Sequence, residues 1–289
     1  MAMSVGQDAG AGAGTGGGEK SYLEDGNVLM LSAPSYCAPV AAALPSAAWH
    51  AGAVAGSVVG VAVATLGWGT FSVGSGLFIP VTQRVEMPHA VALSFDDGPS
   101  EEFTPRLLDL LGEHQAKASF FLIGRYVAKS AKLVRRMVDE GHTVGNHTWD
   151  HHRDGLLGGR DYWDQQIRLG EEAIGDAIGR RPRLFRPPLG FKTATQAGVL
   201  RHRGYEVIGW RLRAFDTLPL SAAAIAQRVV THVRPGDIVT MHDGLEPQRR
   251  NKSQEHTCQA MADILADLRQ RGLQCVSLET GLQRSAYRD

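Results

Sequence analysis

The chain has 289 residues, of which 43% are hydrophobic and 21% are charged. This is the composition of an ordinary globular protein and excludes a wholly disordered chain or a repeat fibre. Thirty Lys and Arg residues balance thirty Asp and Glu residues, so the basic charge of a dedicated nucleic-acid binder is absent and we expect no nucleic-acid partner. The three cysteines, Cys37, Cys258 and Cys275, show no paired spacing, which predicts neither a disulfide framework nor a cysteine metal site.

The first 84 residues divide into two expected segments. Residues 1–26 are rich in glycine and alanine and carry too little apolar bulk to offset the entropy of ordering, so we predict a flexible tail. Residues 27–84 form an apolar segment, because the sequence has no Asp, Glu, Lys or Arg between Asp25 and Arg84.

Residues 49–71 are predicted to form one membrane-spanning helix. They are mainly Ala, Val, Gly and Leu, and about 20 apolar residues suffice to cross the hydrocarbon core. Trp49 and Trp68 lie near the two ends, where indole rings favour the membrane interface. The alternatives are a soluble helix packed on the following domain and a cleaved signal peptide, for which the basic start is missing. Lys20 and Arg84 flank the segment on opposite sides and leave its orientation open.

From residue 85 to residue 289, apolar strand-like runs alternate with amphipathic helical stretches, as in repeated βα units around a parallel sheet. The predicted strands cover residues 90–95, 118–123, 143–146, 184–186, 206–210, 237–241 and 274–278. The predicted helices cover residues 104–113, 131–140, 161–178, 195–203, 222–232 and 257–271, the first with Thr104 as its N-cap. We therefore predict a single α/β domain built as a distorted (β/α)7-8 barrel, although a doubly wound open sheet gives a similar pattern.

The residues able to do chemistry follow these strands directly. Loops after the strands of a (β/α) barrel share one face, so such residues converge although they lie far apart in the sequence. Scattered surface charges do not show this phasing. The residues in question are Asp96, Asp97, His147, His151, Arg186, Asp216 and His242.

Two adjacent carboxylates, Asp96 and Asp97, come at the end of the first predicted strand and precede Gly98-Pro99. One carboxylate of such a pair can bind a cation while the other accepts a proton. A plain solvated turn is the alternative for an isolated Asp-Asp-Gly-Pro.

His147 and His151 follow the third strand and are four residues apart. This separation lets both imidazoles reach one ion when the backbone between them turns helically. Two histidines and one carboxylate form an open metal site that leaves positions for water and substrate.

Arg186 ends the fourth strand and is followed by Pro187-Pro188, which have no backbone N–H and stiffen the turn. Leu189 supplies the next free N–H, a suitable oxyanion contact. The guanidinium of Arg186 is placed to fix a base carboxylate and keep it ionised. A surface turn is the alternative.

His242 follows the sixth strand, a suitable position for a general acid near neutral pH. Asp216, after the fifth strand, is placed to orient this imidazole and raise its pKa. Taken singly, an N-cap Asp and a buried core His are the simpler interpretations, and one shared site accounts for both.

Together these motifs resemble the polysaccharide deacetylase family, carbohydrate esterase family 4, over residues 85–282. The match is close for Ser-Phe-Asp96-Asp97-Gly-Pro, for Asn-His147-Thr-Trp-Asp-His151 and for Phe-Arg186-Pro-Pro-Leu-Gly. It is looser for Trp-Arg-Leu-Arg-Ala-Phe-Asp216-Thr and for Thr-Met-His242.

The resemblance implies hydrolysis of an acetamido group on an amino sugar of a glycan such as a chitooligosaccharide or peptidoglycan. Asp97, His147 and His151 would bind a divalent metal, usually Zn²⁺, with Co²⁺ or Ni²⁺ as alternatives. Asp96 would be the base held by Arg186, and His242 the acid held by Asp216. The Leu189 amide would bind the oxyanion.

Three departures from the family affect the substrate more than the chemistry. Leu189 stands where Tyr is common, Thr217 replaces a usual Trp, and Arg211 and Arg213 replace acidic or small residues. A more basic groove indicates an anionic or lipid-phosphate-linked glycan. An O-deacetylase, a deformylase on a small amino sugar and an inactive glycan-binding module are the alternatives. With the apolar helix, we expect a membrane-associated protein of the cell envelope.

Overall fold

The computed structural model describes residues 46–247 and 254–288, with side chains described from Val54 onward except for Arg153. The predicted tail at 1–26, the first part of the apolar segment and Cys37 lie outside these residues. So does the side chain of Trp49. Cys258 and Cys275 are both free thiols.

Helix α1 spans Ser46–Phe71, slightly longer than predicted. Its window from Val54 to Phe71 has a mean hydropathy of 1.6, and only 6% of that window is buried. Val58, Val63 and Trp68 are each more than half exposed. The helix is therefore long and apolar enough to cross a membrane and differs from a buried core helix, although a signal sequence has the same length and composition.

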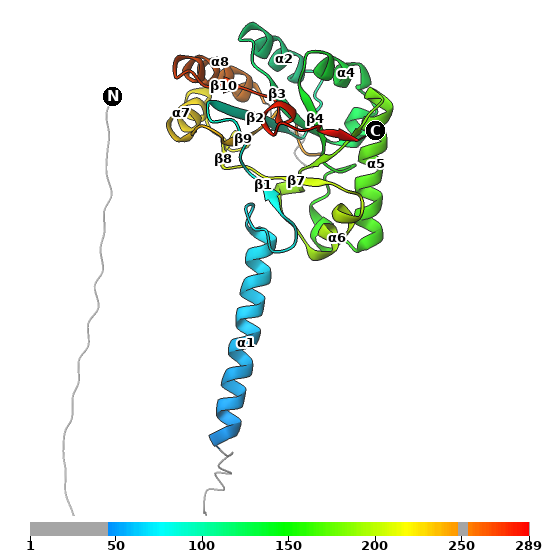
Figure 1. The fold of residues 1–289 in the computed structure, drawn as a ribbon, viewed down its shortest axis with the longest axis vertical. Helices are drawn as coiled ribbons and strands as arrows, with labels where there is room; N and C mark the ends of the chain where they lie inside the picture. The colour runs from blue at the N-terminus through cyan, green and yellow to red at the C-terminus, as the bar shows by residue number, and fades with distance from the viewer. Residues whose placement is uncertain (1–45, 248–253, 289) are drawn as a thin grey trace, which may run out of the picture. The chain divides into compact units, whose positions relative to one another are not determined.

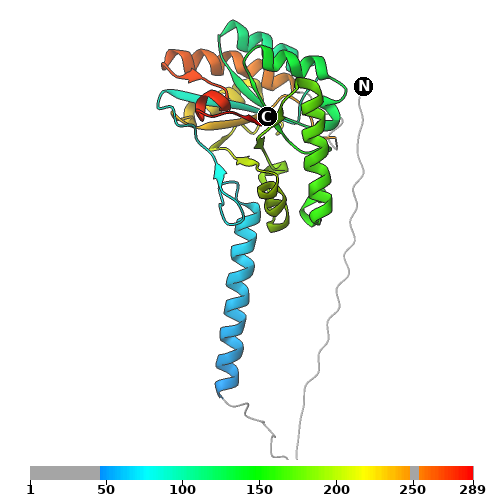
Figure 2. The same cartoon turned by 45° about the vertical axis from the view of Figure 1, so that its right-hand side comes forward.

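The domain that follows is built on a curled parallel sheet (Figures 1 and 2), as predicted. Its strand order is β1-β7-β6-β4-β3-β2-β9-β8, and β10 pairs with β2. In the described part of the chain the terminal strands β1 and β8 do not pair with each other, so the sheet is a half-barrel. The strands are β1 (Val81–Thr82), β2 (Ala90–Asp96), β3 (Ala118–Leu122), β4 (Thr143–Asn146), β6 (Leu184–Phe185), β7 (Glu206–Ile208), β8 (Leu212–Arg213), β9 (Ile238–His242) and β10 (Gln274–Cys275).

Helices follow most of these strands and cover the sheet (Figure 1). They are α2 (Thr104–Glu113), α3 (Gly124–Val127), α4 (Ala131–Asp139), α5 (Arg160–Ile178), α6 (Ala194–His202), α7 (Ala222–His232), α8 (Glu255–Gln270) and α9 (Leu278–Gly281). Helix α2 shows why they pack: Leu107, Leu108 and Leu111 lie on one face and are completely buried. The strands contribute aromatic side chains to the core. The rings of Phe95 on β2 and Phe120 on β3 stack with their centroids 5.2 Å apart.

The long elements match their predictions, and the differences are local. The last predicted strand, 274–278, ends at Cys275, because Ser277 caps helix α9 by accepting a hydrogen bond from the Thr280 N–H. Thr104 is not the N-cap of α2, a position held by Phe103. The Thr104 hydroxyl instead accepts from the Ser100 N–H and donates to Asp243. A short antiparallel pair of β5 (Arg181–Pro182) and β11 (Tyr287–Arg288) was not predicted.

Candidate active site

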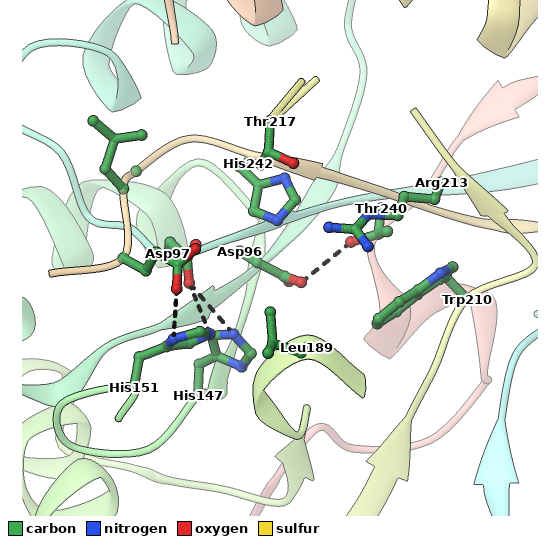
Figure 3. A pocket seen from close by; sticks show the side chains of 13 residues that line it. Asp96, Asp97, His147, His151, Leu189, Trp210, Arg213, Thr217, Thr240 and His242 are labelled. Carbon is green, nitrogen blue, oxygen red and sulfur yellow. Dashed lines mark hydrogen bonds and ion pairs between the residues drawn. The ribbon is translucent and has the colours of Figure 1, made fainter. Parts of the chain in front are cut away.

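The carboxyl ends of neighbouring parallel strands bring the site residues together. Asp96 and His242 are the last residues of β2 and β9, and the sheet register pairs them directly. One pocket at this end of the sheet is lined by six of the eight predicted site residues (Figure 3): Asp96, Asp97, His147, His151, Leu189 and His242. The other two, Arg186 and Asp216, are buried and hydrogen-bonded to members of this set.

Three of the pocket side chains are placed to hold a cation. Oδ1 of Asp97 lies 3.5 Å from Nε2 of His147 and 3.3 Å from Nε2 of His151, and all three residues are buried. Among the described residues, Oδ1 of Asp97 has no hydrogen-bond partner. Burial raises the pKa of Asp97, but His151 and His147 outweigh it and hold this pKa well below its usual range. A buried carboxylate oxygen left without a hydrogen bond beside two imidazole nitrogens fits a divalent ion such as Zn²⁺.

The backbone between the two histidines differs from a helical turn. Thr148 and His151 have left-handed φ angles of 70° and 52°, and the His151 N–H donates to the Thr148 hydroxyl at 3.0 Å. Nδ1 of His147 lies 2.6 Å from the carbonyl oxygen of Arg186, which fixes this ring with Nε2 toward Asp97. The two rings therefore converge through a turn with left-handed residues, closed by the His151–Thr148 hydrogen bond, and not through a helical turn.

Asp96 is held by a buried guanidinium. Nη1 of Arg186 donates to Oδ1 of Asp96 at 2.7 Å, and the hydroxyl of Thr240 donates to Oδ2 at 3.2 Å. Arg186 has no exposed surface and also donates to the Ser94 hydroxyl at 2.9 Å. Its guanidinium carbon lies 4.0 Å from the centre of the Phe121 ring. The Asp96 carboxylate is thus fixed beside the cation site with its charge balanced.

His242 is held by Asp216 through two contacts. Nδ1 of His242 lies 2.9 Å from Oδ1 of Asp216, and the His242 N–H donates to Oδ2 at 2.7 Å. The Thr257 hydroxyl also donates to this carboxylate, at 3.1 Å. Burial lowers the pKa of His242, but Asp216 and then Asp97 and Asp96 outweigh it, so the pKa rises to about 9. Asp216 thus favours the protonated imidazole, the form able to act as an acid.

Leu189 lies in the pocket on the turn after Arg186. Its φ is 57° and that of Gly190 is 76°, so two consecutive residues adopt left-handed backbone. Only glycine accepts this conformation without strain. This turn places Leu189, the first residue after Pro187-Pro188 with a backbone N–H, in the lining of the pocket.

Residues beyond His242 also lie at the site, and no sequence motif pointed to them. Glu246 is buried, lines the pocket and has Oε2 3.8 Å from Nδ1 of His151. Gly244 packs against the backbone of Asp97, where an added Cβ would lie 2.2 Å from the carbonyl oxygen. The available signal was their position in the loop after a strand that ends in a predicted site residue.

The groove wall carries Trp210, Arg213 and Thr217, all of which line the pocket (Figure 3). Nε of Arg213 is buried without a hydrogen-bond partner among the described residues. Arg211 is exposed and is not among the pocket-lining residues. The predicted basic wall therefore consists of Arg213 and not of both arginines.

A half-barrel with an Asp-His-His cation site, a buried Asp-Arg pair and a buried His-Asp pair defines a metal-dependent hydrolase. The family model described as "Polysaccharide deacetylase" matches residues 84–208. The chain is 32% identical over 198 residues to a peptidoglycan-N-acetylglucosamine deacetylase of Bacillus cereus, covering 68% of this chain and 70% of that one. It therefore belongs to the polysaccharide deacetylase family.

Other comparisons agree. The chain is 34% identical over 188 residues to a chitooligosaccharide deacetylase of Sinorhizobium fredii, covering 63% of this chain and 87% of that one. The crystal structure of the Bc1960 peptidoglycan N-acetylglucosamine deacetylase superposes with a TM-score of 0.66 at 30% identity, over 72% of this chain and 94% of that chain. The family resemblance inferred from the motifs and the expected barrel fold are thereby confirmed.

Proposed function

We propose that the protein hydrolyses the N-acetyl groups of amino-sugar units in a glycan, with a divalent metal, Zn²⁺ in the first place, held by Asp97, His147 and His151. The observation that carries this is the convergence of three arrangements in one pocket: the cation site, the Asp96–Arg186 pair and the His242–Asp216 pair. Relatives that act on peptidoglycan and chitooligosaccharide support the substrate class.

The bound ion would supply Lewis-acid polarisation of the acetamide carbonyl and of a water molecule. Asp96, held in place by Arg186, removes a proton as the water oxygen bonds to the carbonyl carbon. The Leu189 N–H donates to the oxygen that gains negative charge. His242 then delivers its proton to the nitrogen as the carbon–nitrogen bond breaks, which releases acetate and leaves the free amine of the sugar.

The decisive experiment combines metal analysis with acetate release from N-acetylglucosamine oligomers, for the wild type, Asp96→Asn and His147→Ala. We expect Asp96→Asn to retain metal and lose acetate release, and His147→Ala to lose both. Absence of bound metal in the wild type, or unchanged acetate release in both variants, would overturn the proposal.

The same machinery serves other small acyl groups, so a substrate panel separates the alternatives. Acetate from N-acetylated oligomers supports the proposal, whereas acetate from xylan acetate alone indicates an O-deacetylase and formate from formyl amides a deformylase. Glycan binding without turnover of any of these would indicate an inactive binding module.

We propose further that the protein is associated with a membrane of the cell envelope. Helix α1 and relatives that act on peptidoglycan support this location. Replacing Val58 and Val63 by Arg places two charges at the centre of the apolar window, which disfavours insertion by several kcal/mol. We expect wild-type protein in carbonate-washed membranes and this variant in the soluble fraction. The opposite result, or wild-type protein found soluble at the size of a shortened chain, would argue for no anchor or for a cleaved signal.

A further inference from the structure

The loop that carries Leu189 is bound to the end of helix α1 by a buried lysine. Lys192 is 1% exposed. Its ammonium donates to the carbonyl oxygens of Ser72 at 2.9 Å, Val73 at 3.0 Å and Gly190 at 3.2 Å. Two of these acceptors follow α1 directly, and the third is the residue after Leu189. One cation thus joins the apolar helix's end to the active-site loop.

Backbone and ring contacts strengthen this connection. The Lys192 N–H donates to the carbonyl oxygen of Thr70, in the last turn of α1, at 3.0 Å. The rings of Phe71 and Phe191 meet edge to face with centroids 5.1 Å apart. Carbonyl oxygens at a helix C-terminus attract cations, and the ammonium lies where the carbonyls of Ser72 and Val73 follow the last turn of α1.

Val73 fits between two glycines of the site wall. A Cβ on Gly190 would lie 2.8 Å from Cγ2 of Val73 and 2.7 Å from Cη2 of Trp210, and a Cβ on Gly209 would lie 3.1 Å from Cγ1 of Val73. Gln83 holds the same wall, because its Nε2 donates to the Trp210 carbonyl oxygen at 2.6 Å. The residues after α1 therefore pack on Gly190 and Gly209 from behind the pocket residues Leu189 and Trp210.

The electrostatics of Lys192 are consistent with this role. Burial lowers the pKa of Lys192 to about 8, so the side chain remains largely protonated at neutral pH. No carboxylate pairs with it in the described part of the chain, and three carbonyl oxygens serve as its partners instead. A charge without a counter-ion is retained in such a place only when several dipoles stabilise it.

We infer that the turn after α1 is a working part of the hydrolytic site, and that Lys192 is a positioning residue which holds the strained Leu189 turn in the geometry that presents its amide to the oxyanion. This rests on the proposed deacetylase function. The apolar helix then does more than attach the domain to a surface, since its end supports the active site.

The test uses the full chain and two matched pairs of variants. Lys192→Met removes the ammonium and keeps the stem, and Lys117→Met is its control, because the Lys117 ammonium also donates to a backbone carbonyl, that of Glu140, far from the site. Val73→Ala loosens the packing on Gly190, and Val63→Ala changes a valine that is 65% exposed on α1.

We expect Lys192→Met to lower kcat for acetate release by about 10- to 100-fold, the range for loss of one oxyanion donor being about 10²–10³. KM should stay within about threefold and bound metal should equal that of the wild type, since neither depends on a contact formed only in the transition state. The affinity for a phosphonamidate analogue should fall with kcat/KM. Lys192→Arg, which keeps the cation, should recover part of the activity, and Lys117→Met should leave kcat unchanged.

The inference fails if Lys192→Met lowers kcat no more than Lys117→Met does, or if it acts by loss of metal or a raised KM alone. If Lys192→Met does not fold, the valine pair decides: a several-fold fall in kcat for Val73→Ala but not for Val63→Ala supports it, and equal kcat overturns it. A wild type that releases no acetate defeats the proposed function itself, whereas an active wild type with a neutral Lys192→Met defeats only this inference.

Discussion

Asp216 accepts two hydrogen bonds from a single residue, His242, one from its ring Nδ1 at 2.9 Å and one from its backbone N–H at 2.7 Å. The carboxylate therefore fixes both the charge of the imidazole and its direction, with Nε2 left for the substrate. A proton on Nε2 is what the proposed acid must deliver.

The first prediction concerns the pH profile of kcat/KM. Because Asp216 raises the pKa of His242, Asp216→Asn should move the alkaline limb of the profile down by about one to two pH units. A divalent ion nearby lowers the pKa of His242 in both proteins, so they are compared with the same metal. Asp176→Asn, an exposed change on α5, is the control. An unmoved alkaline limb would exclude His242 as the titrating acid.

The same shift has a consequence for stability. The pKa of His242 is raised from 6.5 to about 9 on folding, so its contribution to the free energy of unfolding is fully present below pH 6.5 and is lost as pH rises through about 9. In metal-free protein, urea unfolding at pH 6 and pH 9.5 should show a larger loss of stability for the wild type than for Asp216→Asn. Equal losses would contradict the raised pKa.

A third prediction concerns Glu246 and metal affinity. Its Oε2 lies 3.8 Å from Nδ1 of His151, where a small adjustment forms a hydrogen bond that directs Nε2 to the metal. Loss of such a partner weakens metal binding by about 10- to 100-fold, so Glu246→Gln should raise the Kd for Zn²⁺ in a chelator competition. Glu113→Gln, at the exposed end of α2, is the control. Equal Kd values for both variants would remove Glu246 from the metal site.

The buried Asp96–Arg186 pair predicts that substitutions of its two members have strongly coupled effects on stability. Removal of one partner from a buried ion pair costs about 3–5 kcal/mol because the other charge stays buried. Arg186→Met should therefore destabilise the protein by about that amount, and Asp96→Asn combined with it should recover part of the loss in a urea-unfolding double-mutant cycle. Arg106→Met, which breaks an exposed pair with Glu255, should have a much smaller effect. Additive effects of the two buried changes would contradict the coupling.

Arg213 predicts a preference for an anionic glycan. It lines the pocket, and its Nε has no hydrogen-bond partner in the described part of the chain, whereas Arg211 is exposed. Arg213→Ala should lower kcat/KM about 10-fold for a peptidoglycan fragment with a free carboxylate, but little for the same fragment as its methyl ester, since a charge-assisted hydrogen bond contributes about 1.5–3 kcal/mol. Arg211→Ala should change kcat/KM equally for both substrates. A uniform effect of Arg213→Ala would show that no anion is recognised there.

Much of the site was predictable because its residues lie at the ends of buried strands, which the sequence shows as apolar runs. A buried strand such as β2 is an unmistakable apolar run, and in a parallel sheet all strand ends of one direction share an edge. That reasoning places Asp96, His147 and His242 together before any coordinates are known. Helices α2 and α7 were likewise predicted to the residue, since each combines a periodic apolar face with a clear start.

The remainder depends on contacts that local sequence does not encode. Strands of two residues, such as β1 and β8, are too short to show an alternating hydrophobic pattern. They form only because each pairs with a neighbouring strand, β7 or β9. The hydrogen bond from Lys192 to the carbonyl oxygen of Val73 joins two segments that are more than a hundred residues apart in the sequence. Glu246 follows a strand by several residues, and only the fold places it beside His151.

The backbone angle φ of Asp97 has an electrostatic consequence. Asp97 has a φ of 70°, which sends its carboxylate to the two histidines while its neighbour Asp96 faces Arg186. Two carboxylates facing each other at close range must share a proton, and one of them then loses its charge at neutral pH. The left-handed turn at Asp97 instead gives the two carboxylates separate partners, the imidazoles of His147 and His151 for Asp97 and the guanidinium of Arg186 for Asp96.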